Sequence, residues 1–223
     1  MEKKFFDNLE NKTVIVAGGN GLIGSAIVKA LEAYGADVVC ADIRGEGEYF
    51  DMAEPESVGA LLQRHYKCDA FINCTRTDNT KASIDSWLRC TEAVAQFFSC
   101  GGGSIVNFGS IYGVVGSDMS LYEDTSMTMP IGYAGIKGFI ISASRDIACK
   151  YGRYDVRCNV VSPGGVYDNQ PIEFERRYVK KVPLGRMAES EDIVGIVLFL
   201  VSDWSEYITG QNFLVDGGLT AQC

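Results

Sequence analysis

A glycine-rich turn near the start of the chain separates an apolar run from a segment of helical periodicity. Residues 13–17 are apolar and mostly β-branched, four glycines fall within residues 18–24, and apolar side chains then recur at Ile27, Leu31 and Tyr34. A strand, a glycine turn and a helix in this order let the backbone approach a pyrophosphate, which also meets the unpaired N–H groups of the helix N-terminus. The pattern therefore predicts a dinucleotide site within an α/β fold.

The second predicted strand covers residues 37–41 and is followed by Asp42, eighteen residues beyond Gly24 (42 − 24). A carboxylate at this place accepts hydrogen bonds from the two ribose hydroxyls of NAD and repels the 2′-phosphate of NADP. The sequence thus predicts NAD as the cofactor.

Strands and helices alternate along the chain, as in a parallel sheet covered on both faces. We expect strands at 13–17, 37–41, 48–50, 69–73, 104–108, 155–161 and 212–215, and helices at 22–34, 55–66, 82–99, 132–151 and 190–202. Only six residues separate Asp42 from Tyr49, whereas a helical crossover needs about a dozen, so one crossover helix is expected to be reduced to a loop. The sequence predicts a single Rossmann-type, doubly wound α/β domain over residues 1–223.

Tyr133 and Lys137 stand four residues apart in a predicted helix, and Ser110 ends an apolar run upstream. This spacing places the phenol and the ammonium on one helix face. A free tyrosine has a pKa of about 10, and a neighbouring cation stabilises the phenolate and lowers that pKa. A serine hydroxyl aimed at the same point holds a substrate oxygen while the tyrosine moves its proton. The three residues are candidate catalytic groups, although a Tyr-x-x-x-Lys pair alone also fits a solvated helix surface.

Taken together, these motifs resemble the short-chain dehydrogenase/reductase family over nearly the whole chain. The matching segments are 18–24, Asp42, 50–52, 72–73, 105–110, Tyr133 with Lys137, 157–164 and 209–218. The resemblance implies Tyr133 as general acid/base, Lys137 as the pKa-lowering cation and a ligand of the nicotinamide ribose, and Ser110 as the partner of the substrate oxygen. It implies a cofactor site made of Gly18, Asn20, Gly21, Leu22, Ile23, Gly24, Asp42, Asp51 (near the adenine), Met52, Asn73, Cys74, Tyr133, Lys137, Pro163, Gly164 and Val166.

The chain departs from the family pattern in several places. Ala17 replaces a threonine, and Gly21 comes one place early, as in the sugar-nucleotide epimerases and dehydratases. After Asn73, residues 74–76 read Cys-Thr-Arg in place of Asn-Ala-Gly. The nearest candidates for the helix asparagine that completes the family's proton relay are Asn79 and Ser83.

Composition limits the other classes of partner. The net charge of −9 argues against a nucleic-acid surface, and no apolar run reaches the ~18 residues of a membrane helix. The N-terminal residues are too charged, and the stretch too short, for a signal peptide. Eight cysteines occur without CxxC or Cys/His metal spacing, and the sole histidine is His65. We therefore expect reduced cysteines, no metal site, no membrane or nucleic-acid partner and a cytoplasmic location.

Two segments beside the predicted site look like insertions, one near residues 111–131 and the other near 165–185. Both are rich in polar and aromatic side chains, and loops above a cofactor site commonly carry specificity. We interpret them as substrate-loop insertions, with surface decoration as the alternative. Features of residues 105–218 resemble the flagellin-modification oxidoreductases associated with nonulosonic (sialic-acid-like) sugar synthesis. This resemblance implies a polar, sugar-type substrate.

We therefore predict an NAD(H)-dependent oxidoreductase that interconverts a secondary alcohol and a ketone on a small, sugar-type molecule. Two alternatives stay open: a nucleotide-binding scaffold or regulatory protein with impaired catalysis, and an NAD-retaining sugar epimerase or dehydratase. Apolar residues on more than one side of helices 82–99 and 132–151 indicate a homo-oligomer, at least a dimer, and the family resemblance implies a tetramer through a second contact at the C-terminal strand. These residues are Trp87, Val94, Phe97, Phe98, Phe139, Ile140, Ile141 and Ile147.

Overall fold

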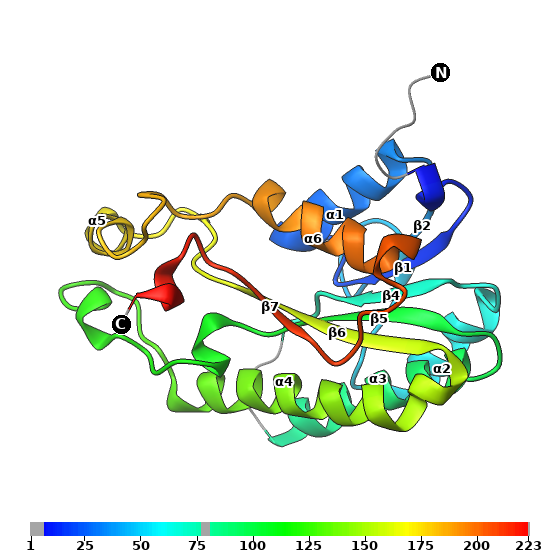
Figure 1. Ribbon diagram of the computed structural model, residues 1–223. Coiled ribbons are helices and arrows are strands. Elements are labelled where there is room, and N and C mark those ends of the chain that lie inside the picture. The colour runs from blue at the N-terminus through cyan, green and yellow to red at the C-terminus, as the bar shows by residue number, and fades with distance from the viewer. Residues whose placement is uncertain (1–6, 77–80, 223) are drawn as a thin grey trace.

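Seven parallel strands form one twisted sheet in the order β3-β2-β1-β4-β5-β6-β7 (Figure 1). The computed structural model describes residues 7–76 and 81–222. The chain builds outward from β1 to β3 and then crosses to β4 on the other side of β1, so the strand order reverses between β1 and β4. The predicted strands and the doubly wound fold are confirmed. The strands are β1 Thr13–Ala17, β2 Asp37–Asp42, β3 Glu48–Tyr49, β4 Ala70–Asn73, β5 Gly103–Phe108, β6 Val156–Pro163 and β7 Asn212–Val215.

Helices cover both faces of the sheet, α1 and α6 on one face and α2, α3 and α4 on the other (Figure 1). Alternate residues of β1 supply the two cores: Val14 and Val16 pack with α1 and α6, while Ile15 and Ala17 face the other layer. This alternation follows from the two-residue period of a strand. The helices are α1 Leu22–Ala33, α2 Pro55–Arg64, α3 Lys81–Phe98, α4 Ile131–Tyr151, α5 Ile172–Val179 and α6 Ser190–Val201.

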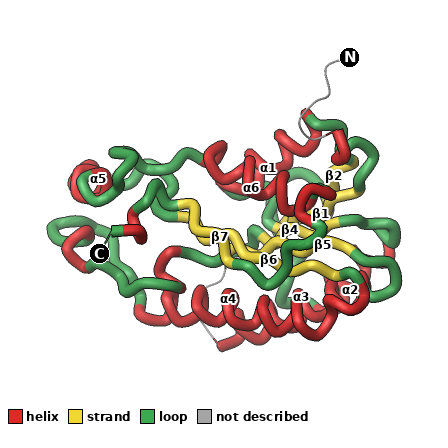
Figure 2. The backbone as a smooth tube through the Cα atoms, viewed as in Figure 1, coloured by secondary structure: helices red, strands yellow, loops and turns green. Residues whose placement is uncertain are grey.

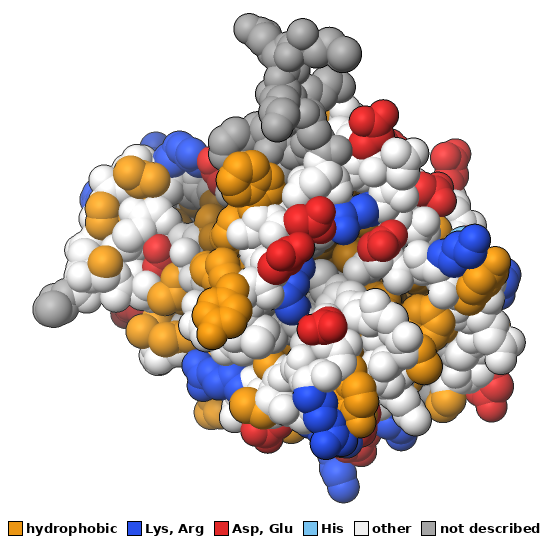
Figure 3. Space-filling model, turned by 45° about the vertical axis from the view of Figure 1, so that its right-hand side comes forward, with side chains coloured by type: hydrophobic (Ala, Val, Ile, Leu, Met, Phe, Trp, Pro, Cys, Tyr) orange, Lys and Arg blue, Asp and Glu red, His pale blue; other side chains and the backbone are white. Residues whose placement is uncertain are grey.

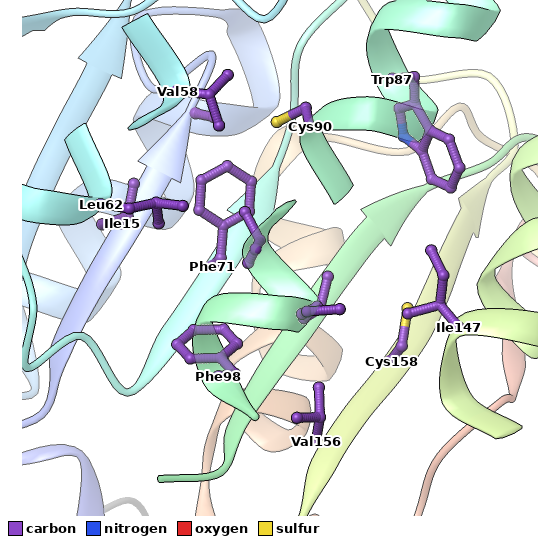
Figure 4. Packing of buried hydrophobic residues seen from close by; sticks show 14 of the residues in the cluster. Ile15, Val58, Leu62, Phe71, Trp87, Cys90, Phe98, Ile147, Val156 and Cys158 are labelled. Atoms are coloured by element: carbon purple, nitrogen blue, oxygen red, sulfur yellow. The ribbon is translucent and has the colours of Figure 1, made fainter. Parts of the chain in front are cut away.

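The core beneath α2, α3 and α4 buries most of the apolar residues from which the sequence predicted an interface between subunits. In Figure 4, Trp87 and Phe98 of α3 and Ile147 of α4 point into the same layer as Phe71 of β4. The Trp87 ring also meets the Phe139 ring edge-on, with centroids 5.9 Å apart. Because α3 and α4 pack against each other on the sheet, six of these eight residues are buried within this chain, whereas Phe97 and Phe139 are only partly buried. That basis for predicting an oligomer is wrong for the six residues that are fully buried, Trp87, Val94, Phe98, Ile140, Ile141 and Ile147.

The connection between β2 and β3 is the loop predicted from the short spacing, residues 43–47. Its path is fixed by the Asn20 side chain, whose Nδ2 donates to the carbonyl oxygens of Arg44 (2.7 Å) and Glu46 (2.8 Å). Gly47 has a φ of +105°, and a Cβ there would lie 2.3 Å from the Cys40 carbonyl oxygen. Only glycine fits that close turn. An amide side chain of the glycine turn thus holds a loop where a longer connection would carry a helix.

A satellite lobe lies beyond the carboxyl ends of the strands, at the left of Figure 2, where α5 faces the segment between β5 and α4. The sequence had not predicted α5, because its charged residues obscured Phe174 and Tyr178, which stand four apart and are both buried. These rings pack with Tyr122 of the facing segment. Lys181 forms an ion pair with Asp118 across the lobe. The two predicted insertions therefore pack against each other as one unit.

On the face drawn in Figure 3, acidic and basic side chains are interspersed, and neither charge forms a continuous patch. Within the described ranges, 7–76 and 81–222, no helix has both the length and the apolar character needed to cross a bilayer.

Candidate active site

Two adjoining pockets open at the carboxyl ends of the strands, where the strand order reverses. Ligands of open α/β sheets bind at this edge. The first, here called the turn pocket, has a volume of about 650 Å³, and the second, the tyrosine pocket, about 910 Å³. They share a wall formed by Ile43 and by the three residues that follow β4, Cys74, Thr75 and Arg76. Together they form one elongated cleft.

Most of the predicted site residues line this cleft. The turn pocket includes Gly18, Asn20, Gly21, Asp42, Asp51, Met52 and Cys74. The tyrosine pocket includes Ile23, Cys74, Ser110, Tyr133, Lys137, Pro163, Gly164 and Val166. Three predicted residues line neither pocket: Leu22, Gly24 and Asn73.

Gly24 does not face the cleft, and its role is to allow α1 to pack closely against the glycine turn. It is buried in the first turn of α1, and a Cβ there would lie 2.2 Å from the Gly18 carbonyl oxygen. The missing side chain lets α1 begin directly against the turn. Gly21 is the N-cap of this helix and makes no side-chain cap hydrogen bond. The helix therefore presents its N-terminal N–H groups and partial positive charge to the turn pocket, as an anion site requires.

The Asp42 carboxylate is held at the rim of the turn pocket by two backbone donors. Its Oδ2 accepts from the Asn20 N–H at 3.0 Å, and its Oδ1 accepts from the Arg44 N–H at 3.3 Å. Asn20 thus fixes the carboxylate through its backbone and the following loop through its side chain. A carboxylate oxygen has further lone pairs, so Asp42 can still accept hydrogen bonds from a bound diol.

Tyr133 and Lys137 face the tyrosine pocket from the first two turns of α4, as the four-residue spacing predicts. The Lys137 Nζ lies 5.7 Å from the centre of the Tyr133 ring. It donates to the Phe108 carbonyl oxygen at 2.9 Å, while the side chain is only 9% exposed. Burial lowers the pKa of Lys137 to about 8. A single carbonyl partner leaves two of its three N–H groups available to the pocket.

Ser110 lies at the end of β5, buried beside the same pocket. Its Oγ accepts from the Tyr112 N–H at 3.2 Å and caps a short 3₁₀ turn, residues 111–113. Because that bond uses a lone pair, the hydroxyl proton stays free to donate to an oxygen in the pocket. A hydroxyl donor, a phenol and a buried amine on one cavity form the set needed to move a proton to or from a carbonyl or carbinol oxygen.

The end of β4 contributes a wall of the cleft. Asn73 and Cys74 were predicted as cofactor residues, whereas Thr75 and Arg76 were noted only as departures from the family pattern. Asn73 is buried, and its Oδ1 accepts from the Thr75 hydroxyl at 2.5 Å and the Thr75 N–H at 3.2 Å. This fixes the turn that brings Cys74 and Arg76 to the cleft. Burial raises the pKa of the Cys74 thiol, so the thiol is protonated and unreactive at neutral pH.

Further lining residues were not among the predicted catalytic or cofactor residues. Ile43, Ala82, Ser83 and Ser86 line the turn pocket, and residues 128–130 of the first insertion line the tyrosine pocket. Ser83, one of the two candidates for the helix asparagine, is thus placed beside the cleft, while Asn79 lies outside the described residues. Across the described ranges, no three His, Cys, Asp or Glu side chains gather as a metal site would need.

Comparisons with known proteins agree with this geometry. A family model described as "Enoyl-(Acyl carrier protein) reductase" matches residues 69–220. A 7alpha-hydroxysteroid dehydrogenase of Clostridium sardiniense is 31% identical, over 94% of this chain and 94% of its own. Post-translational flagellin modification protein A of Campylobacter coli is 27% identical, over 94% and 98%. The crystal structure of a short chain dehydrogenase from Leptospira borgpetersenii with bound NAD+ is similar at 34% identity and a TM-score of 0.84, covering 99% of this chain and 97% of that one.

Proposed function

Because the chain belongs to the short-chain dehydrogenase/reductase family, we propose that it uses Ser110, Tyr133 and Lys137 to interconvert a secondary alcohol and a ketone with NAD(H). The observation that carries this proposal is the convergence of the three side chains on one pocket that adjoins the glycine turn. A catalytically impaired scaffold would have no need to keep a buried amine, a phenol and a serine hydroxyl together.

The residues of the cleft fit NAD along its length. The N-terminus of α1 and the glycine turn suit the pyrophosphate, and Asp42 suits the adenosine ribose. Asp51 and Met52 line the turn pocket beyond Asp42, where the adenine is expected. The Asp42 carboxylate would repel a 2′-phosphate, so the fit favours NAD over NADP. When bound, the nicotinamide ring accepts or supplies the hydride.

The protein's own residues handle the proton. In the oxidation direction, Tyr133 takes the proton of the substrate hydroxyl, and in reduction it returns that proton to the carbonyl oxygen. The charged Lys137 amine beside it stabilises the phenolate form. The Ser110 hydroxyl donates to the same substrate oxygen and so fixes its distance from Tyr133. Tyr133 and Lys137 come from α4 and Ser110 from the turn that follows β5, and both elements pack against the core.

We further propose a polar, sugar-type substrate. The tyrosine pocket offers Thr75, Arg76 and Thr128 as polar groups around the catalytic residues. The similarity to a flagellin modification protein supports a role in the metabolism of surface-glycan sugars. The relative from Clostridium sardiniense is by name a hydroxysteroid dehydrogenase, so similarity alone does not identify the substrate class. The proposal of a sugar-type substrate therefore depends mainly on the polar residues that line the pocket.

Exchange of Tyr133 for phenylalanine tests the proposal. Tyr133→Phe removes only the hydroxyl, so NAD affinity should stay within about threefold while turnover falls by about 10²–10⁴-fold. Tyr167→Phe is the matched control, because Tyr167 is a half-exposed tyrosine of the second insertion that lines neither pocket. NADH formation is followed with a panel of polyols and sugar acids.

The outcomes of this experiment separate the alternatives. Near-native turnover by Tyr133→Phe would contradict the assigned mechanism. A native protein that binds NAD but oxidises no member of the panel would favour the scaffold. NAD that stays bound through purification, with sugar conversion and no net NADH, would favour the epimerase or dehydratase.

The proposal includes a homo-oligomer in the cytoplasm. Since the apolar residues of α3 and α4 are used within the chain, the support comes from the edge of the sheet at β7. Leu214 of β7 is 41% exposed, and in the segment between α6 and β7 Trp204 is 67% exposed and Tyr207 is fully exposed. Apolar side chains of this size beside an unpaired edge strand favour a two-fold contact with a second copy.

A further inference from the structure

The two halves of the cleft differ in charge. Asp42 and Asp51 line the turn pocket together with Arg44 and Arg76, whereas no aspartate or glutamate of the described residues, 7–76 and 81–222, lines the tyrosine pocket. The tyrosine pocket instead carries two cationic side chains, Lys137 and Arg76. The chain as a whole has 29 acidic and 20 basic residues, so an acid-free, dibasic pocket runs against its overall charge.

Arg76 has no structural role that would account for its charge. Its side chain is exposed on the wall shared by the two pockets, and no carboxylate of residues 7–76 or 81–222 forms an ion pair with it. By contrast, two other exposed arginines of this chain, Arg64 and Arg186, are paired with Glu48 and Asp192. The hydrogen bonds of Thr75 to Asn73 hold the backbone just before Arg76, so they position the Arg76 backbone from which the guanidinium extends.

A guanidinium in this place suits an oxyanion. Its planar fork binds a carboxylate or phosphate through two parallel hydrogen bonds, and a cleft wall strengthens such a bond relative to open water. The pyrophosphate of the cofactor already has the glycine turn and the N-terminus of α1. Arg76 is not needed for the pyrophosphate, and because it also lines the tyrosine pocket it can meet the other ligand of the cleft.

We propose that Arg76 is the specificity residue for a substrate that carries a carboxylate or phosphate besides its reacting hydroxyl. This inference rests on the proposed function, since it takes the tyrosine pocket as the substrate site. The substrate class becomes a polyhydroxylated acid or a sugar phosphate. Ser110 and Tyr133 hold the reacting oxygen, and Arg76 holds the anionic group from the wall that the two pockets share.

Binding to the NADH complex tests this without turnover. Calorimetry compares tartrate with L-threitol, which has the same four-carbon skeleton but alcohols in place of carboxylates, and glycerol 3-phosphate with glycerol. NADH is used because its ring is uncharged and attracts no anion itself. The native complex should bind at least one anion about 10-fold or more tightly than its neutral partner, the least that a charge-assisted hydrogen bond supplies.

Arg76→Gln should remove that preference, and Arg76→Lys, which keeps the charge but not the fork, should retain part of it. Arg145→Gln is the control, because Arg145 is exposed on α4, lines neither pocket and changes the net charge equally. Dependence on Arg76 in the tartrate pair assigns a carboxylate, and dependence in the phosphate pair assigns a phosphate.

The proposal is overturned if the native complex binds neither anion, if each neutral partner binds as tightly as its anion, or if Arg76→Gln binds both anions normally. It is also overturned if Arg76→Gln weakens NADH about 10-fold and leaves anion binding unchanged, since Arg76 would then serve the cofactor. These readouts need no Tyr133 hydroxyl. A failure of the Tyr133→Phe prediction and a failure here are therefore distinguishable.

Discussion

Asn20→Ala should weaken the adenosine half of NAD binding while leaving the nicotinamide half intact. The side chain makes two hydrogen bonds to the short β2–β3 connection, to Arg44 at 2.7 Å and to Glu46 at 2.8 Å. That connection in turn donates from the Arg44 N–H to the Asp42 carboxylate. Removing the amide frees the loop and loosens the carboxylate that faces the ribose.

The size of the effect follows from the two bonds. Each neutral hydrogen bond contributes about 1 kcal/mol net, so the pair stabilises the loop by about 2 kcal/mol. If NAD must then order the loop on binding, its affinity falls by up to about 30-fold, since 1.4 kcal/mol corresponds to a factor of ten. The Asn20 backbone N–H still reaches Asp42, so the loss should not exceed that limit.

Calorimetric titration with fragments of the cofactor separates the two halves. AMP and NAD should lose affinity by a similar factor in Asn20→Ala, and nicotinamide mononucleotide should bind as it does to the native protein. Ser25→Ala is the matched control: Ser25 donates to the Leu22 carbonyl oxygen within the same β–α unit and does not touch the loop. Equal losses for AMP and nicotinamide mononucleotide, or AMP affinity within about twofold of native, would refute the reasoning.

Two further predictions concern Lys137 and the assembly. Burial lowers the pKa of Lys137 from 10.5 to about 8, so between these two pH values the unfolded chain binds the proton and the folded chain does not. The free energy of unfolding of the native apoprotein, relative to that of Lys137→Met, should therefore rise with pH across this window. Urea titrations at pH 7, 8.5 and 10 measure it, and a flat or falling difference would contradict the prediction. Sedimentation at micromolar concentration should show a mass above the 24.3 kDa monomer, and Tyr207→Glu should shift it downward, whereas a native monomer would reject the oligomer.

The sequence predicted the order of elements well because the signals there are local. The alternation of apolar residues, the glycine turn and the acid after β2 each depend on neighbours within a few residues. The short β2–β3 connection was also predictable, since a chain of five residues cannot hold a crossover helix. The role of the Asn20 side chain was not, because it requires knowing that Arg44 and Glu46 return to the turn after β2 leaves it.

Contacts between distant segments account for the other errors. Helix α5 depends on Phe174 and Tyr178 packing against Tyr122, which is about fifty residues earlier, so composition alone marked the segment as a polar loop. The sequence showed that α3 and α4 carry apolar residues on more than one side. It did not show that Trp87 of α3 and Phe139 of α4 would contact each other. A helix that needs two apolar partners finds one in the sheet and the other in its neighbour, without a second subunit.

Lys137 links the binding of anions to the chemistry of the site. The amine must be charged to stabilise the Tyr133 phenolate, yet burial lowers its pKa to about 8, so the empty cleft does not hold that charge firmly. No carboxylate lines its pocket to restore the pKa. Negative charge brought into the cleft by the cofactor pyrophosphate, and by an anionic substrate at Arg76, favours the protonated amine instead. The coupling is reciprocal: protonation of Lys137 strengthens the binding of each anion by the same factor by which that anion favours the protonated amine. If Arg76 binds an anionic substrate as proposed, Lys137 therefore keeps its proton more firmly in the complex with NADH and that substrate than in the complex with NADH and a neutral substrate.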